Sequence, residues 1–303
     1  MRPYIALVTA AVIWGAAPPI FKFAYENIPP FTLGLLRFSL SLFILLPFLR
    51  GTNTSKMRSR DWMMLAAASL FMAAHLCLFF VGLERTESIN TSIIASVGPI
   101  LLYIASVTFL HEAKSNKILT GMIIALLGSL IVIVAPLVRI GGSVGFGEFT
   151  GNMFILLSTI CEIISIAFLK SVLNRITPRL ALVVSFAICA LIFYPLSLWE
   201  LQSWSFAQLD YRGIWGIVFG TLFSSTIAYY LHDYGISKIK AEEVGLFSYI
   251  TPVVTVLVAI PLLAEFPDPY FYAGTALVFL GIVIAENKFR FHPSYELKRQ
   301  KPH

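Results

Sequence analysis

Residues 118–138 read ILTGMIIALLGSLIVIVAPLV, a run without a charged side chain. About 20 apolar residues in an α-helix cross the hydrocarbon core of a bilayer, which is roughly 30 Å thick. Lys117 and Arg139 bound the run at its two ends. The segment therefore predicts a transmembrane helix, and its pattern recurs along the rest of the chain.

The composition of the whole chain excludes a soluble protein. Apolar types make up 58% of the 303 residues and charged types only 13%, against about 45–50% and about 25% in soluble domains. The net charge is +6. Such a charge would indicate a nucleic-acid partner only if the basic residues formed one face of a soluble domain, so we expect no nucleic-acid partner. Cys77, Cys161 and Cys189 lie within apolar runs and are expected to be buried thiols, not disulfides or metal ligands.

Charged or turn-rich breaks divide the chain into ten apolar runs. The predicted spans are residues 4–25, 31–49, 62–83, 88–110, 118–138, 149–170, 179–199, 212–236, 241–263 and 270–286. Every connection between them is short, so consecutive helices must be antiparallel neighbours. We expect an all-α integral membrane protein with ten transmembrane helices.

The distribution of basic residues predicts the orientation. With the N-terminus in the cytoplasm, 17 of the 22 basic residues lie in inner segments and only Arg85, Arg139 and Arg212 in outer ones. Cytoplasmic loops of membrane proteins carry an excess of Lys and Arg. Both termini are therefore expected to be cytoplasmic, including a basic tail at 287–303, in a multi-pass protein of the inner (cytoplasmic) cell membrane.

The second half of the chain repeats the first. Matching residues recur at an offset of 148 and then of 153: Lys22 and Lys170, Pro30 and Pro178, Pro47 and Pro195, Gly82 and Gly235, Pro99 and Pro252, Glu112 and Glu265, Gly121 and Gly274, Gly128 and Gly281. Five helices per half is an odd number, so the second copy is inverted. We expect a first repeat at 1–140, an outer linker at 141–148 and a second repeat at 149–286, the arrangement of alternating-access transporters.

These residues also resemble a known family. Trp14-Gly15 followed by Lys22, Arg37 after a Pro-bounded turn, Pro99 and Pro252 each followed by a Glu, and the paired Gly-x6-Gly motifs look like the ten-helix EamA-type branch of the drug/metabolite transporter superfamily. The resemblance covers about residues 4–286. It implies a fold and a transport class, since members of that family move amino acids, other metabolites, nucleotide-linked sugars or cationic drugs, and many bacterial members resemble exporters.

Glu162 is the first candidate site residue. It precedes Lys170, at the inner end of its span, by about 12 Å along the helix, which places it near the bilayer midplane. Intramembrane carboxylates are usually functional. Ser158 and Ser165 share its helix face. Glu162 is expected to be a proton site or a counter-ion for a cationic substrate group, with a hydrogen-bonded structural carboxyl as the alternative.

Four further residues carry titratable side chains within the predicted spans: His75, His232, Asp233 and Arg37. His75, with Phe79 one turn on, is expected near mid-membrane as a proton relay or as an interhelical hydrogen-bonding group. His232 and Asp233 are shallower and line an inner vestibule or lie at the wetted interface. Arg37 is expected to bind a substrate carboxylate or, like Lys22 as part of the family pattern, to close the outer gate or pin broken backbone.

Polar stripes mark two proline-containing spans. Polar side chains inside a membrane must face protein or water. The residues concerned include Ser96, Pro99 and Tyr103 in one span and Tyr249 and Pro252 in the other. Pro99 and Pro252 are expected to act as gating kinks or packing wedges, and Trp14, Phe79, Tyr103 and Tyr229 to form the aromatic lining.

The sequence thus predicts a secondary transporter with a substrate site near the midplane. We expect a monomeric exporter of amino acids or related small solutes, with proton coupling through Glu162. The alternatives are efflux of organic or quaternary cations and, from a different class, a passive channel or facilitator. Enzyme motifs are absent, and no cofactor or metal is expected; the partners are the solute, the lipid bilayer and protons.

Overall fold

A computed structural model describes residues 3–49, 57–98, 101, 116–140, 142–173, 175–238, 247 and 250–286, and these contain helices and no strand. The α-helices are α1 (Pro3–Tyr25), α2 (Pro30–Leu45), α3 (Ser59–Arg85), α4 (Ser88–Ala95), α6 (Asn116–Arg139), α7 (Gly142–Val172), α8 (Pro178–Glu200), α9 (Tyr211–Val218), α10 (Tyr230–Lys238), α12 (Ile250–Leu263) and α13 (Pro269–Glu286). Short 3₁₀ turns are η1 (Leu46–Leu49) and η2 (Phe206–Gln208), and η3 (Phe219–Tyr229) is a π-helix.

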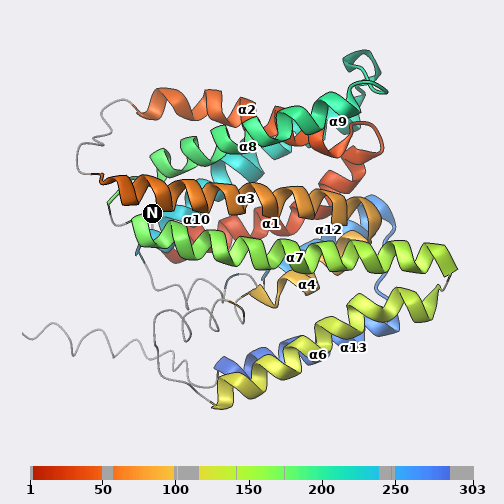
Figure 1. Cartoon of the computed structure of the whole chain (residues 1–303). Helices are drawn as coiled ribbons and strands as arrows, with labels where there is room; N and C mark the ends of the chain where they lie inside the picture. The colour runs from red at the N-terminus through yellow and green to blue at the C-terminus, as the bar shows by residue number, and fades with distance from the viewer. Residues whose placement is uncertain are drawn as a thin grey trace, which may run out of the picture.

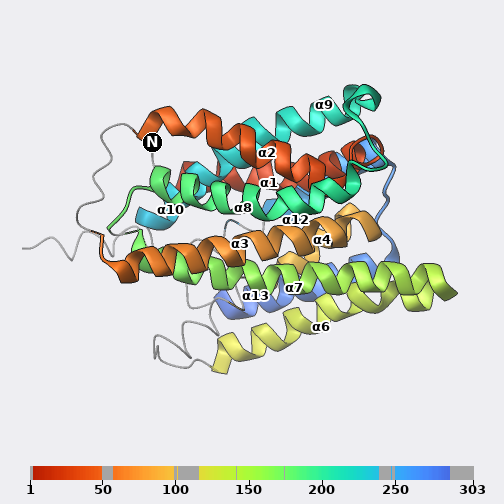
Figure 2. The same cartoon turned by 45° about the horizontal axis from the view of Figure 1, so that its top comes forward.

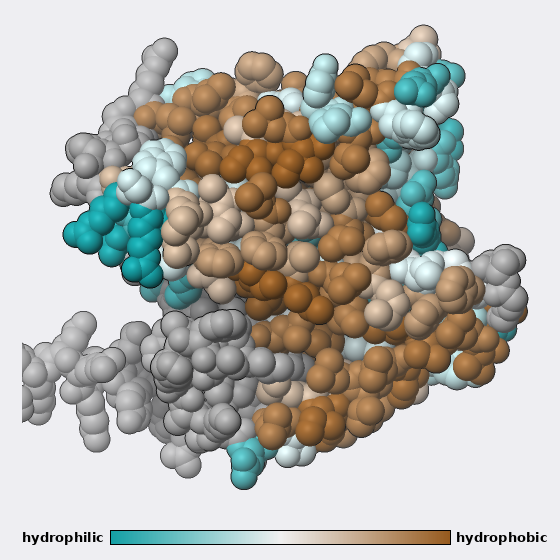
Figure 3. Space-filling model, in the orientation of Figure 1, coloured by the Kyte–Doolittle hydropathy of each residue, from teal (hydrophilic) through white to brown (hydrophobic). Residues whose placement is uncertain are grey.

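The long helices are membrane spans by length and composition. Seven stretches reach both criteria: Pro3–Tyr25, Pro30–Leu49, Ser59–Arg85, Leu119–Arg139, Gly145–Val172, Pro178–Glu200 and Tyr211–Lys238. Apolar surface covers the face between the two ends of the helices, and hydrophilic residues gather at those ends (Figure 3). The all-helical membrane fold is therefore confirmed. The predicted spans 88–110 and 241–263 lie partly outside the described residues, so the count of ten stays a prediction.

Helices from the two halves of the chain pack against each other. The principal pairs are α3 with α7, α2 with α8, α6 with α13, and α1 with α12 (Figures 1 and 2). The Gly-x6-Gly motifs, Gly121/Gly128 and Gly274/Gly281, allow α6 and α13 to approach closely. A Cβ atom on Gly128 would lie 2.5 Å from the Gly274 carbonyl oxygen and 2.8 Å from the Val278 nitrogen, closer than atoms can pack.

The glycine-rich segment after α6 differs from its prediction. The sequence predicted a linker at 141–148 and a span from residue 149, whereas α7 already begins at Gly142. The helix starts early because α6 and α7 meet at a tight corner. A Cβ atom on Gly145 would lie 2.5 Å from the Pro136 carbonyl oxygen, so that glycine permits close backbone approach.

The predicted span at 212–236 is interrupted by the π-helix η3. In η3 the Thr226 hydroxyl donates to the Thr221 carbonyl oxygen five residues earlier, at 2.8 Å. Hydroxyl and carbonyl groups of Ser224 and Ser225 bond to side chains of α1 and α2. Such π segments occur frequently at functional sites, and Ser224 and Tyr229 of this one line a cavity between the helices.

Ion pairs join several helices at the end of the bundle that holds the C-terminus of α1. Arg139 of α6 lies 3.2 Å from Glu87, 3.3 Å from Glu148 and 3.1 Å from Asp268. Lys22 of α1 lies 3.2 Å from Glu265, in the connection between α12 and α13. This end of the bundle is therefore held together across both halves of the chain.

Candidate functional site

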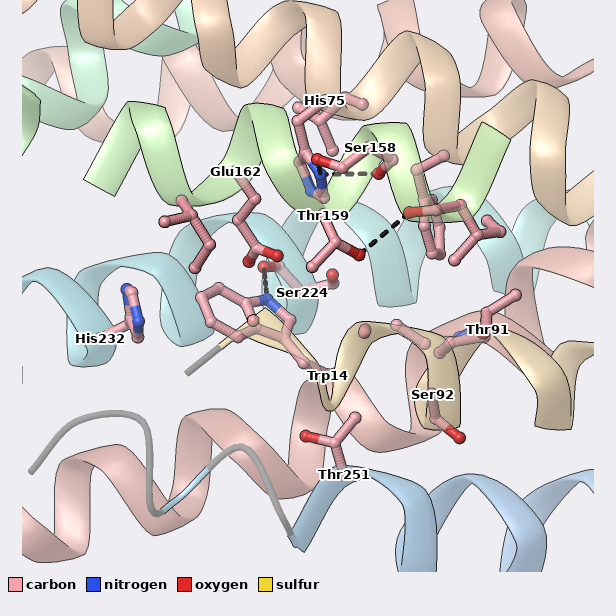
Figure 4. Close-up of a pocket in the computed structure, with 18 of the residues that line it drawn as sticks. Trp14, His75, Thr91, Ser92, Ser158, Thr159, Glu162, Ser224, His232 and Thr251 are labelled. Carbon is pink, nitrogen blue, oxygen red and sulfur yellow. Dashed lines mark hydrogen bonds between the residues drawn. The ribbon is translucent and has the colours of Figure 1, made fainter. Parts of the chain in front are cut away.

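A cavity of about 170 Å³ lies between α1, α2, α3, α4, α7, η3, α10 and α12 (Figure 4). Nine of the residues predicted from the sequence line it: Trp14, Arg37, His75, Phe79, Ser96, Ser158, Glu162, Tyr229 and His232. Predicted site residues from both halves of the chain therefore lie around one cavity. Tyr103, Tyr249 and Pro99 lie outside the described residues, and Pro252 is buried in α12 without lining the cavity.

Glu162 lies on α7 with its carboxylate in the cavity (Figure 4). It has no hydrogen bond or ion pair with any residue that the structure describes, so the alternative of a hydrogen-bonded structural carboxyl finds no support there. A carboxylate removed from water is stable only when a cation, a proton or hydrogen-bond donors compensate it. Glu162 is therefore open to a ligand or a proton.

Arg37 lies in α2 and is only 2% exposed. Its Nε donates to the Ser225 hydroxyl at 2.5 Å and its Nη2 to the Ser224 hydroxyl at 3.1 Å. The rings of Phe21 and Phe38 each lie 4.8 Å from its guanidinium carbon. Cation–π contacts and hydroxyl groups hold the guanidinium in place, but within the described residues no carboxylate pairs with it. An anionic group that entered the cavity would supply the negative charge that the Arg37 guanidinium lacks.

His75 is fixed by α7. Its Nδ1 lies 2.8 Å from the Ser158 hydroxyl oxygen and 3.1 Å from the Ser158 carbonyl oxygen. A carbonyl oxygen only accepts, so this contact favours the tautomer with the proton on Nδ1 and leaves Nε2 able to accept another. Phe79 packs near the imidazole, with ring centroids 6.1 Å apart.

Trp14 lines this cavity and also an adjoining, smaller one of about 30 Å³. Its Nε1 donates to the Ser224 carbonyl oxygen at 3.1 Å, and its ring lies 4.9 Å from that of Tyr229 and 4.8 Å from that of His232. Trp14, His75, Glu162, Tyr229 and His232 line both cavities. The two cavities therefore adjoin along these five side chains.

Ser165 and Asp233 line only the smaller cavity. The Ser165 hydroxyl donates to the Ala68 carbonyl oxygen at 2.7 Å and so ties α7 to α3. Sequence reasoning missed four polar residues of the main cavity: Thr91, Thr159, Ser224 and Thr251. Thr159 directly follows the predicted site residue Ser158 in sequence, and that adjacency was the available signal. Ser224 faces the cavity because of the π-helix, which no sequence pattern indicated.

Lys22 and Glu265 join three parts of the chain beyond the cavity. Besides pairing with Glu265, the Lys22 ammonium donates to the Thr86 carbonyl oxygen. The Glu265 carboxylate accepts from the Ser88 hydroxyl at 2.6 Å and from the Ile89 backbone nitrogen at 3.2 Å. The pair thus holds α1 and the α12–α13 connection against the start of α4.

Comparisons with known proteins agree with this architecture. The sequence model of the EamA-like transporter family matches residues 1–134 and 149–286. The uncharacterized transporter YyaM of Bacillus subtilis is 26% identical, covering 98% of this chain and 97% of that protein. A "probable terminal-alkyne amino-acid exporter" of Streptantibioticus cattleyicolor is 22% identical over 93% of both chains. A solved crystal structure with 17% identity has the same fold, with a TM-score of 0.68 over 93% of this chain and 96% of the other.

Proposed function

The chain belongs to the EamA-like transporter family, and from this premise we propose that it exports amino acids or related zwitterionic solutes by alternating access. It is a multi-pass membrane transporter and not an enzyme. The proposal places the protein in the cytoplasmic membrane as a monomer of ten spans, with both termini in the cytoplasm. The excess of basic residues on that side supports this orientation.

The observation that carries the proposal is a cavity with one unpaired charge of each sign. Glu162 and Arg37 both line it, and neither pairs with an opposite charge among the described residues. Unpaired charges in a low-dielectric site are unfavourable. A zwitterion compensates both, since its ammonium pairs with Glu162 and its carboxylate with the Arg37 guanidinium. The amino-acid exporter among the relatives is consistent with such a ligand.

The helix packing supports an inverted repeat. If α1 corresponds to α7, α2 to α8, α4 to α12 and α6 to α13, the α2–α8 and α6–α13 contacts each join an element to its own counterpart. The α1–α12 contact then has its equivalent in α4–α7. The family model also matches the two halves separately. Two such halves rocking about a midplane site would give alternating access, with the Lys22–Glu265 pair closing the outer end.

One feature favours a second candidate, the efflux of organic cations. Trp14 and Tyr229 present aromatic rings beside Glu162, and aromatic faces with a carboxylate bind quaternary ammonium groups. Such a substrate leaves Arg37 without an anion, and for this reason the zwitterion is preferred.

Counterflow in proteoliposomes tests the proposal. We expect vesicles preloaded with unlabelled L-amino acids to take up a labelled L-amino-acid mixture, and Glu162→Gln to lower the initial rate at least tenfold. Glu26→Gln is the matched control, because Glu26 pairs with Arg212 on the exposed surface, away from the cavity. Intact transport in Glu162→Gln would refute the role of Glu162. Competition by tetraalkylammonium but not by amino acids would favour cation efflux, and uptake without counterflow would indicate a channel.

A further inference from the structure

Arginine side chains gather at the end of the bundle where α3 and α8 begin and α7 ends. Four exposed residues form this arginine cluster: Arg58, Arg60, Arg175 and Arg179. Figure 3 shows a strongly hydrophilic patch at this end of the molecule, directly beside the apolar surface of the spans. None of the four side chains lines the main cavity. The arginine cluster therefore faces the surroundings of the protein and not the candidate substrate site.

Contacts of Asp61 bring the start of α3 and the α7–α8 connection together. Arg175 Nη1 lies 2.7 Å from Asp61 Oδ1, and the Arg58 backbone N–H donates to Asp61 Oδ2 at 2.9 Å. Arg175 is the member of the cluster that pairs with a carboxylate among the described residues. The positive charges of Arg58, Arg60 and Arg179 are left without a carboxylate partner there.

Arg179 joins the same place from the first turn of α8. Its Nη1 donates to the Phe48 carbonyl oxygen at 3.3 Å, which connects α8 to η1. Leu49 of η1 and Met57, just before α3, pack against the apolar cluster that contains Leu180 of α8. The arginines from α3, from the α7–α8 connection and from α8 consequently surround one packed region of the molecule.

Exposed apolar side chains border the arginine cluster at the depth of the membrane surface. Phe48 is 56% exposed, Trp62 41% and Met63 61%. Tryptophan is enriched where the hydrocarbon core of a bilayer meets the headgroups, and Trp62 lies in the first turn of α3. Arg58 precedes Trp62 by four residues, or about 6 Å along a helix. The guanidinium groups are therefore expected at headgroup depth, with the apolar side chains against the acyl chains.

We propose that the arginine cluster is a binding site for an anionic phospholipid. The lipid phosphate pairs with the guanidinium groups that lack a carboxylate, since arginine binds phosphate through two parallel hydrogen bonds. The acyl chains lie along Trp62 and Met63. The inference depends on the membrane fold alone, so it stands or falls separately from the proposed substrate. In the proposed orientation the site faces the cytoplasmic leaflet, where basic pockets bind anionic headgroups.

The charge of the cluster favours an anionic lipid over a zwitterionic one. Phosphatidylcholine carries a phosphate as well, but the positive guanidinium groups repel its quaternary ammonium. An anionic lipid such as phosphatidylglycerol has no positive group. A soluble phosphate would match the charges equally well, but it would make no contact with the exposed rings of Phe48 and Trp62.

Arginines at the opposite end of the bundle are compensated by carboxylates. Arg139 lies within 3.3 Å of the carboxylates of Glu87, Glu148 and Asp268. Arg212 lies 2.7 Å from Glu26 and 2.8 Å from Asp210. Neither guanidinium leaves an uncompensated charge for a lipid phosphate, so we expect the lipid preference to be specific to the arginine cluster.

Quenching of Trp62 fluorescence by brominated lipids tests the site locally. The full-length protein is reconstituted into bilayers that mix brominated phosphatidylglycerol with phosphatidylcholine, and phenylalanine replaces the other tryptophans: Trp14, Trp199, Trp204 and Trp215. We expect phosphatidylglycerol to bind beside Trp62 about tenfold more strongly than phosphatidylcholine, because each basic residue near a membrane favours an anionic lipid about fivefold. Arg58→Gln combined with Arg60→Gln should reduce the preference to within about twofold by the same estimate.

Two controls separate a site from a general attraction of anionic lipids. A protein that keeps only Trp215, which is 61% exposed on α9, should show no preference for phosphatidylglycerol. Lys238→Gln removes an exposed positive charge from α10 and should leave the preference at Trp62 unchanged. An equal preference at Trp62 and Trp215, or an equal loss per charge in Lys238→Gln, contradicts the proposal.

The wild-type protein gives a second test that does not depend on the tryptophan replacements. A ligand that binds only the folded state raises the thermal unfolding midpoint. We expect phosphatidylglycerol added to the detergent-purified protein to raise the midpoint by several degrees, and phosphatidylcholine and inorganic phosphate not to. The combined Arg58→Gln and Arg60→Gln variant should lose this rise. Equal rises with both lipids overturn the proposal, and an equal rise with inorganic phosphate assigns the arginine cluster to a soluble anion instead.

Discussion

The ion pair between Lys22 and Glu265 is expected to set how often the outer end of the transporter opens. In Glu265→Gln the side chain keeps its size and an acceptor oxygen but loses its charge. The Glu265 side chain is 9% exposed and that of Lys22 is 28% exposed, so the loss is smaller than for a fully buried pair. A hydrogen bond to a charged group contributes about 1.5–3 kcal/mol. We therefore expect Glu265→Gln to destabilise the closed state relative to the open state by about 2 kcal/mol. This lowers the ratio of closed to open molecules about 30-fold.

Labelling of a cysteine in the main cavity measures this opening. Ser96→Cys, in a protein with Cys77, Cys161 and Cys189 replaced by alanine, places one thiol in the cavity wall. A membrane-impermeant maleimide added outside intact cells should react about 30-fold faster in the Glu265→Gln background, by the same estimate.

A control variant and a charge-reversed double variant test whether the Lys22–Glu265 ion pair itself sets the labelling rate. Glu26→Gln, at an exposed ion pair of the same end, should leave the labelling rate unchanged. Exchanging the two charges, Lys22→Glu with Glu265→Lys, should restore part of the slow rate. If the labelling rate of the Glu265→Gln variant is within twofold of that of its parent, the ion pair does not stabilise the closed state.

Three other expectations concern packing and the site. Gly128→Val should lower the thermal unfolding midpoint, because overpacking α6 against α13 costs about 1–3 kcal/mol; Gly147→Ala, with nothing within 4 Å, should not. Glu200→Ala should destabilise the protein to urea by about 1–2 kcal/mol, since its carboxylate accepts from the first backbone N–H groups of α2 at 3.0 and 2.6 Å; an unchanged midpoint would exclude that cap. Trp14→Phe removes the bond to Ser224 and should raise the transport KM several-fold; an unaltered KM would exclude Trp14 from the site.

The fold was largely predictable because the bilayer imposes a strong pattern. Long uncharged runs can only be spanning helices, and their charged flanks gave most helix bounds to within a few residues. The start of α7 was misplaced because Gly145 reads as a flexible residue, whereas it meets the Pro136 carbonyl oxygen. A sequence pattern along one chain does not report the approach of a second segment.

The lining of the candidate cavity was predictable at its charged positions and less so elsewhere. Glu162 and His75 stood out because ionisable groups are rare at mid-membrane depth. The partners of Arg37 could not be predicted, because Ser224 and Ser225 reach it through a π-helix that tertiary contacts stabilise. The smaller cavity beside Asp233 was equally hidden, since side chains from α1, α3, α7, α8 and α10 form it together.

Competition by charge-deleted analogues tests the central claim most directly. The claim is that a zwitterion lies between Glu162 and Arg37 in the main cavity. In proteoliposome counterflow of a labelled L-amino-acid mixture, unlabelled amino acids should compete strongly. Amines that lack the carboxylate and acids that lack the amino group should compete at least tenfold more weakly. If the amines compete as well as the amino acids do, Arg37 binds no substrate carboxylate and the account is contradicted.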